Sequence, residues 1–240
     1  MIKPRILSAI LAFYFTALHV IIAVFFLKPH LINQLKSKLD YKQPEISELY
    51  KTLLTFQLRS DALLPNDSVI FIGDSITQGL CVSCVAKGSA NYGIGGDTTL
   101  GVLKRIAKYH SIKNSKAVVL AIGLNDLDKR DDEEILGNFK EIIHMIPLRI
   151  PMIVSGVLPV DESFTLSPAR KNNRIRELNN KIMLLCRKYK NSIFFNSTSN
   201  LVDRAGNLKR QFHTGDGVHL STDGYKVWIT DLRQKLHEIR

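Results

Sequence analysis

The sequence has few cysteines, and its acidic residues are well outnumbered by basic ones. Three cysteines in 240 residues cannot build a disulfide framework, because at most one pair forms and one thiol stays free. The 33 Lys and Arg residues exceed the 22 Asp and Glu residues and give a net charge of +11, which favours anionic partners such as lipid headgroups, acidic glycans or nucleic acid. There is no RNP-type motif, no zinc-finger spacing and no Arg-rich reading helix, so nucleic acid is not a predicted partner.

Other motifs that would define an enzyme class are also missing. The chain has no Gly-x-Ser-x-Gly elbow of the α/β-hydrolase type, because Gly73-Asp74-Ser75-Ile76-Thr77 lacks the final glycine. It has no P-loop, since no Gly-Lys-Ser/Thr occurs. His213, Asp216 and His219 have a spacing that metal ligands can have, but no second ligand cluster supports a metal site. We therefore predict neither a metal nor another cofactor.

One long hydrophobic run is present, at the N-terminus. Residues 6–27 contain no Lys, Arg, Asp or Glu, and as a helix they would span about 33 Å, enough to cross a bilayer. The run is too long for a cleavable signal peptide and lacks small residues before a cut site, so it predicts an uncleaved membrane anchor. Basic residues flank it on both sides. A very short basic N-terminus usually stays cytoplasmic, which would place the large domain in the periplasm or outside the cell.

The composition divides the chain into three predicted parts. Residues 1–28 are the membrane anchor, residues 29–65 a polar connector with an amphipathic helix, and residues 66–240 the catalytic domain. In the connector, apolar residues recur near helical spacing and are expected to pack on the domain: Ile46, Leu49, Leu53, Leu54 and Phe56.

Strands and helices alternate through the third part. Apolar or β-branched runs predict strands at 68–72, 89–92, 117–122, 152–157 and 192–195. Helical patterns lie at about 98–109, 132–147, 168–189 and 222–238. Apolar runs unbroken by polar residues are typical of a parallel sheet that helices cover on both faces, so we predict an α/β fold.

Chemically useful residues follow several of these predicted strands. Ser75 comes after the first strand, a glycine cluster at 93–96 after the second, and Asn125 after the third; Asp216 and His219 precede the last helix. Sheets of this type bind ligands beyond the carboxyl ends of their strands, so these residues are expected to meet there.

Together these residue types suit nucleophilic catalysis. A serine hydroxyl becomes a good nucleophile when an imidazole accepts its proton. Of the seven histidines, only His213 and His219 fall in such a loop, and His219 has Asp216 three residues before it. That carboxylate would fix the imidazole tautomer and stabilise the imidazolium. The Ser75 amide, a glycine amide of 93–96 and the Asn125 side chain would donate hydrogen bonds to a developing oxyanion.

This set of motifs resembles the SGNH superfamily of GDSL-type esterases and acylhydrolases over about residues 66–236. Gly73-Asp74-Ser75 resembles the first family block, with Ser75 as nucleophile, and Asn91–Thr98 the second, with Gly96 as the oxyanion glycine. Gly123–Asp126 matches the third block and gives Asn125 an oxyanion role, while Asp216 and His219 match the last. The resemblance implies a three-layer α/β/α fold with a flavodoxin-like parallel sheet, an acyl-serine intermediate and no metal. Ile76 departs from the leucine of the family nickname.

The expected function is a membrane-anchored serine esterase that removes a short acyl group, acetyl above all, from a glycan or lipid. Two alternatives remain open: an acyltransferase that uses the same residues on a polysaccharide, and a non-catalytic binding module tethered to a membrane.

Three further features are given no role in catalysis. Cys81 and Cys84 have C-x-x-C spacing without a second ligand pair, so they form a loop disulfide or remain two thiols. Asp74 is expected to be a structural hydrogen-bonding group, and the basic stretch 170–190 a solvated helix face.

Overall fold

The computed structural model describes residues 11, 13–19, 47–164 and 167–239. The chain divides into two units, Met1–Glu45 and Ile46–Arg240. In the first unit, residues 11 and 13–19 are helical. Among all described residues, no helix combines the length and the apolarity needed to cross a bilayer. The predicted membrane helix at 6–27 lies largely outside the described residues and stays a prediction.

The second unit is built on a five-stranded parallel sheet, as the apolar runs predicted. Its order is β2-β1-β3-β4-β5, the flavodoxin-like order. The strands are β1 (Val69–Gly73), β2 (Ser89–Gly93), β3 (Ala117–Ala121), β4 (Met152–Ser155) and β5 (Ser192–Phe195). Every residue of β1 and β4 is buried, which explains why these segments lack the alternation of a one-sided sheet.

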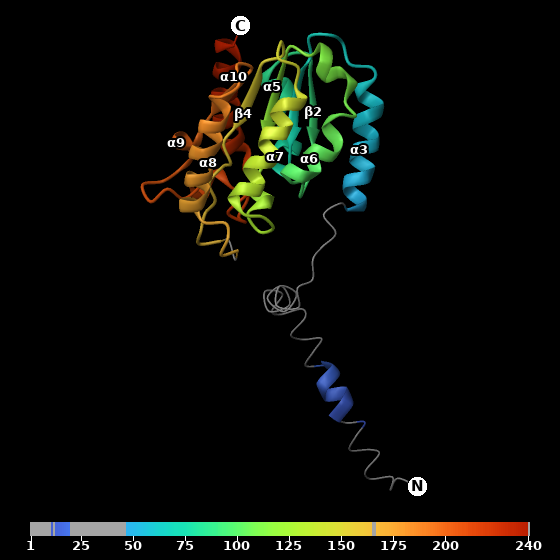
Figure 1. Cartoon of the computed structure of the whole chain (residues 1–240). Coiled ribbons are helices and arrows are strands. Elements are labelled where there is room, and N and C mark those ends of the chain that lie inside the picture. The colour runs from blue at the N-terminus through green and yellow to red at the C-terminus, as the bar shows by residue number, and fades with distance from the viewer. Residues whose placement is uncertain (1–10, 12, 20–46, 165–166, 240) are drawn as a thin grey trace. The chain divides into compact units, whose positions relative to one another are not determined.

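Helices cover both faces of this sheet. Figure 1 shows α6 (Thr99–Ile106), α7 (Asp132–Met145) and α8 (Asn172–Cys186) side by side on one face. On the other face, α10 (Thr222–Glu238) packs with the short helix α5 (Val82–Val85). The remaining short helices are α4 (Ser75–Gln78), α9 (Thr198–Leu201), η1 (His110–Asn114), η2 (Leu124–Asp126) and η3 (Arg210–Phe212). The expected helix at 168–189 begins later, at Asn172.

Helix α3 (Glu48–Asp61) packs differently from the prediction. Of the expected apolar face, Leu54 is buried, but the side chains of Leu49 and Phe56 are 54% and 55% exposed. Besides this packing, polar groups attach the helix: the Tyr50 hydroxyl donates to the Gly101 carbonyl at 2.9 Å, and Gln57 Nε2 donates to the Gly93 carbonyl at 3.0 Å. Apolar periodicity ignores such hydrogen bonds, so the predicted face is wrong in part.

The carboxyl ends of three strands lie level with one another. Gly73 at the end of β1 pairs in register with Gly93 of β2 and with Ala121 of β3. The chain leaves β1 toward β2 on one side and enters β3 on the other, so this end of β1 is the topological switch point. The loops that carry Ser75, Gly96 and Asn125 therefore begin at one edge of the sheet.

Candidate active site

Ser75 lies at a sharp turn between β1 and α4. The strand ends at Gly73, where a Cβ would collide with the Thr77 side chain and the Ala121 carbonyl, so only glycine fits. Asp74 caps α4, and its Oδ1 accepts from the Ile76 amide at 3.0 Å. Ser75 is the first residue of the helix and is half-buried at the carboxyl edge of the sheet. The strand and the cap together fix where its hydroxyl can point.

Asp216 and His219 occupy the loop before α10. Asp216 Oδ1 accepts from the backbone amides of Val218 and His219, both at 2.9 Å. Its other oxygen, Oδ2, lies 2.5 Å from His219 Nδ1. The carboxylate thus organises its own loop as well as the imidazole.

The structure brings the three predicted triad residues together. His219 Nε2 lies 2.9 Å from Ser75 Oγ, although the two residues are 144 positions apart. With Nδ1–H donated to Asp216, Nε2 is the unprotonated nitrogen and is positioned to accept the serine proton. The side chain of His219 is 47% exposed, so the site opens to solvent and to a substrate.

Asp216 stays ionised across the working pH range. Partial burial alone would raise the pKa of this carboxyl, but the hydrogen bonds from His219 and from the Val218 and His219 amides outweigh burial and lower the pKa to about 2. A permanent negative charge beside Nδ1 stabilises the imidazolium that forms when His219 takes a proton.

The three predicted oxyanion donors are the Ser75 amide, the Gly96 amide and the Asn125 side chain. The Ser75 amide is the first of α4, and Gly96 adopts φ +75°, a left-handed conformation that turns the chain at the end of the glycine loop. Within the described part of the chain neither amide donates to another group, whereas the neighbouring Gly95 amide donates to Gln78 Oε1 at 2.6 Å. Asn125 Nδ2 donates one hydrogen to the Asp97 carbonyl at 3.0 Å and has a second one to give.

Arg170 orients Asn125, a contact that the sequence did not reveal. Arg170 Nη2 donates to Asn125 Oδ1 at 3.3 Å, and its Nε donates to Asp128 at 2.7 Å. An arginine cannot accept a hydrogen bond, so this contact defines which end of the Asn125 amide is the oxygen. The Nδ2 group is thereby directed toward Asp97 and the site. Arg170 belongs to the basic stretch predicted to be only a solvated face.

The buried ion pair of Arg105 and Asp97 holds the glycine loop 93–96 in place. Arg105 is fully buried; its guanidinium pairs with Asp97 at 2.8 Å and donates to the Gly73 and Tyr92 carbonyls at the ends of β1 and β2. Asp126 accepts from the Thr99 amide at 2.9 Å and so connects the Gly123–Asp126 segment to α6. These side chains hold the loops that carry Gly96 and Asn125. No local signal in the sequence marks Arg105 as buried.

Asp74 is a buried carboxyl behind the nucleophile. Burial raises its pKa to about 7, despite the hydrogen bond from the Ile76 amide that favours the ionised form. Its contact with that amide agrees with the predicted structural role rather than with an acid acting on substrate.

His213 serves the catalytic loop. Its ring is buried, and Nδ1 accepts from the amides of Gly215 and Gly217 at 3.1 and 3.0 Å, while Nε2 faces Asp161 at 3.3 Å. The imidazole therefore braces the turn that carries Asp216. Among the described residues no group of three or more His, Cys, Asp or Glu side chains could hold a metal ion.

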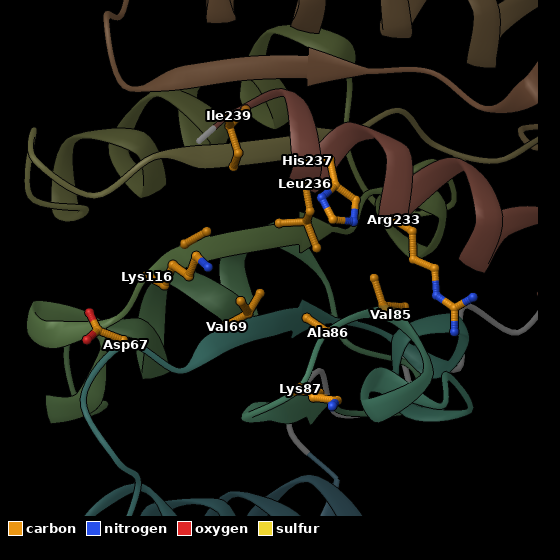
Figure 2. Close-up of a pocket in the computed structure, with 11 residues that line it drawn as sticks. Asp67, Val69, Val85, Ala86, Lys87, Lys116, Arg233, Leu236, His237 and Ile239 are labelled. Carbon is orange, nitrogen blue, oxygen red and sulfur yellow. The ribbon is translucent and has the colours of Figure 1, made fainter.

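Cys81, Cys84 and a cavity at the other end of the sheet lie away from Ser75, Asp216 and His219. Cys81 and Cys84 are exposed at helix α5, with their sulfur atoms 2.6 Å apart. A cavity of about 480 Å³ is lined by Val69 and Ala117, the first residues of β1 and β3, and by Arg233 and Leu236 of α10. Figure 2 shows Val69, Arg233 and Leu236 around it. Since it opens at the amino ends of the strands, it is not the site where Ser75 reacts.

Comparison with known proteins is consistent with this geometry. Residues 71–227 match the GDSL-like Lipase/Acylhydrolase family. Platelet-activating factor acetylhydrolase IB subunit alpha2 of Homo sapiens is 29% identical over 186 residues, covering 71% of this chain and 75% of that protein.

Solved structures show the same fold. A Streptococcus pneumonia protein named after platelet activating factor superposes with a TM-score of 0.73 at 25% identity, covering 87% of this chain and 99% of that one. A mutant of an acetyl-xylooligosaccharide esterase of Geobacillus Stearmophilus superposes with a TM-score of 0.56 at 15% identity, covering 71% and 94% of the two chains. At that identity the likeness concerns the fold alone.

Proposed function

The chain belongs to the GDSL-like lipase/acylhydrolase family, and from that premise we propose that it is a serine esterase that hydrolyses short acyl esters, acetyl esters above all, of a lipid or glycan. The observation that carries the proposal is the distance of 2.9 Å between Ser75 Oγ and His219 Nε2, with Asp216 bound to the other ring nitrogen. A serine so placed has the base that it needs to become a nucleophile.

In the proposed reaction, Ser75 Oγ attacks the ester carbonyl carbon while His219 Nε2 takes the serine proton. The amides of Ser75 and Gly96 and the Nδ2 group of Asn125 donate to the resulting oxyanion. His219 then gives its proton to the departing alkoxide, which leaves as an alcohol, and an acyl group remains on Ser75. Water attacks this acyl-serine with His219 as base, and the acid is released.

The acetyl preference is supported by a relative. The human protein that is 29% identical is named an acetylhydrolase of platelet-activating factor. Glycan esters remain within the proposal because the fold is shared with an acetyl-xylooligosaccharide esterase.

Replacement of the nucleophile tests the activity. Ser75→Ala is expected to abolish hydrolysis of p-nitrophenyl acetate and to leave the circular dichroism spectrum and melting temperature unchanged. Full activity in this variant would contradict the proposal. Transfer of the acetyl group to an added polysaccharide in place of water would contradict hydrolysis and favour an acyltransferase.

We also propose that residues 6–27 anchor the chain in a membrane with residues 66–240 on the extracytoplasmic side. The support is the uncharged run and the short basic segment before it. A C-terminal alkaline phosphatase fusion is expected to be active in cells, and an inactive fusion that is expressed at the same level would contradict this orientation.

A further inference from the structure

A groove of about 500 Å³ lies beside the catalytic turn, between α3 and the edge strand β2. Its exposed apolar surface comes from Leu53 and Phe56 of α3 and from Leu64 just after this helix, while the buried residues Ala90 and Tyr92 of β2 line its floor. Ligand pockets in proteins are mostly apolar and fall in this range of size. The groove is therefore large enough for a substrate group.

The exposed apolar side chains in the groove point to an aliphatic occupant. Phe56 is 55% exposed and Leu53 is only half-buried, so burying them under a ligand would remove apolar surface from water. None of the eleven lining residues carries a charge, so the groove offers nothing to an anionic headgroup or an acidic glycan.

Two polar side chains that line the groove, Gln57 and Asn91, are already committed to internal hydrogen bonds. Gln57 donates to the Gly93 carbonyl and accepts from the Tyr109 hydroxyl at 2.6 Å. Asn91 Nδ2 donates to the Thr77 carbonyl at 2.7 Å, and its Oδ1 accepts from the Gly93 amide at 2.9 Å. These two side chains therefore offer little to a sugar, whereas an alkyl chain needs no hydrogen-bond partner.

The groove ends at a residue of the catalytic turn. Gln78 lines the groove and is the last residue of α4, the helix that Ser75 begins. Gln78 Oε1 accepts from the Gly95 amide at 2.6 Å, and a Cβ built on Gly95 would lie 3.1 Å from this oxygen and 3.9 Å from Ser75 Cβ. Gly95, which has no side chain, therefore lies close to both the Gln78 side chain and Ser75.

From this continuity we propose that the groove binds the alkyl chain of the leaving alcohol, so that the natural substrate is an acetyl ester of a lipid. The inference rests on the proposed esterase activity and narrows its substrate class. The acetyl group lies at Ser75, and the alcohol portion runs over Gly95 and Gln78 toward Phe56. After acyl transfer, His219 protonates the alkoxide and the long-chain alcohol leaves along the groove.

A series of alkyl acetates, kept below their solubility limits, tests the groove with the full-length chain. We expect kcat/KM to rise about 10-fold from ethyl to hexyl acetate, because four added methylenes each gain part of the free energy of full burial. Phe56→Ser is expected to remove most of this rise and to leave ethyl acetate within about 2-fold of wild type. Leu49→Ser is the matched control, because Leu49 is equally exposed on the same helix but lies outside the groove.

The isomers hexyl acetate and ethyl hexanoate then separate the two ends of the ester. A preference for hexyl acetate that Phe56→Ser abolishes and Leu49→Ser keeps supports the groove. Equal rates for both isomers, no gain with alkyl length, or the same loss in both variants would overturn it while ethyl acetate hydrolysis still supports the esterase. If the wild type hydrolyses no acetate at all, both the proposed esterase activity and the proposed role of the groove are contradicted.

Discussion

Asp216→Asn isolates the contribution of the carboxylate to the triad. The amide side chain would keep an oxygen for the backbone amides of Val218 and His219, which Asp216 Oδ1 accepts at 2.9 Å. Its NH₂ group would then face His219 Nδ1, where Oδ2 lies now. The imidazole would have to accept there and would carry its proton on Nε2, the nitrogen that must take the proton of Ser75. The loop is preserved while the wrong tautomer is favoured.

The expected loss follows from how accessible this carboxylate is. In a buried triad the same change lowers kcat about 10⁴-fold. The Asp216 side chain is 45% exposed, so water competes for His219 Nδ1–H and the correct tautomer stays partly populated. We therefore expect kcat to fall about 10³-fold, equivalent to about 4 kcal/mol of transition-state stabilisation.

Steady-state kinetics with p-nitrophenyl acetate measure this loss. KM should change little, because Asp216 is not expected to touch the substrate. Asp223→Asn is the matched control, since Asp223 pairs with Lys226 at 2.8 Å on the exposed surface of α10. A decrease of less than about 10-fold, or an equal decrease in the control, would refute the assigned role of Asp216.

Three further predictions concern the surroundings of Ser75. Asn125→Ala should lower kcat about 10²- to 10³-fold with the fold intact, because it removes one oxyanion donor; unchanged kcat would exclude Asn125 from that role. Gly96→Ala should cost about 1 kcal/mol of unfolding free energy in urea, because φ is +75° with no steric clash, and a neutral result would mean that the turn tolerates a side chain. Asp74 has its pKa raised from 3.8 to about 7 in the folded state, so its contribution to stability is full at acid pH and is lost as the pH rises through 7. Urea unfolding at pH 5 and pH 8 should show this decrease in wild type and a smaller one in Asp74→Asn; identical pH dependences would contradict the raised pKa.

The sheet and the catalytic residues were predictable because each depends on short local patterns. The run Val69–Ile72 is apolar throughout because β1 is buried on both faces, and the same pattern marks β3 and β4. Ser75, Asn125 and His219 follow strand ends or precede a helix, and a parallel sheet collects such positions at one edge.

The supporting contacts were not predictable, because they join distant segments through polar side chains. Arg105 looks like any helical arginine until Asp97 and two strand-end carbonyls surround it. Arg170 reaches Asn125 across 45 residues. For α3, the apolar spacing favoured burial of Phe56, whereas Tyr50 and Gln57 set the orientation of the helix and leave Phe56 at the groove.

Covalent trapping of the nucleophile identifies the reactive residue of this protein. The full-length protein is treated with a fluorophosphonate probe, digested, and mapped by mass spectrometry. We predict one phosphonyl adduct, located on Ser75, formed at a rate that falls in His219→Ala and absent in Ser75→Ala. An adduct on another residue, or none on Ser75 in a folded and otherwise esterase-active protein, would contradict the account.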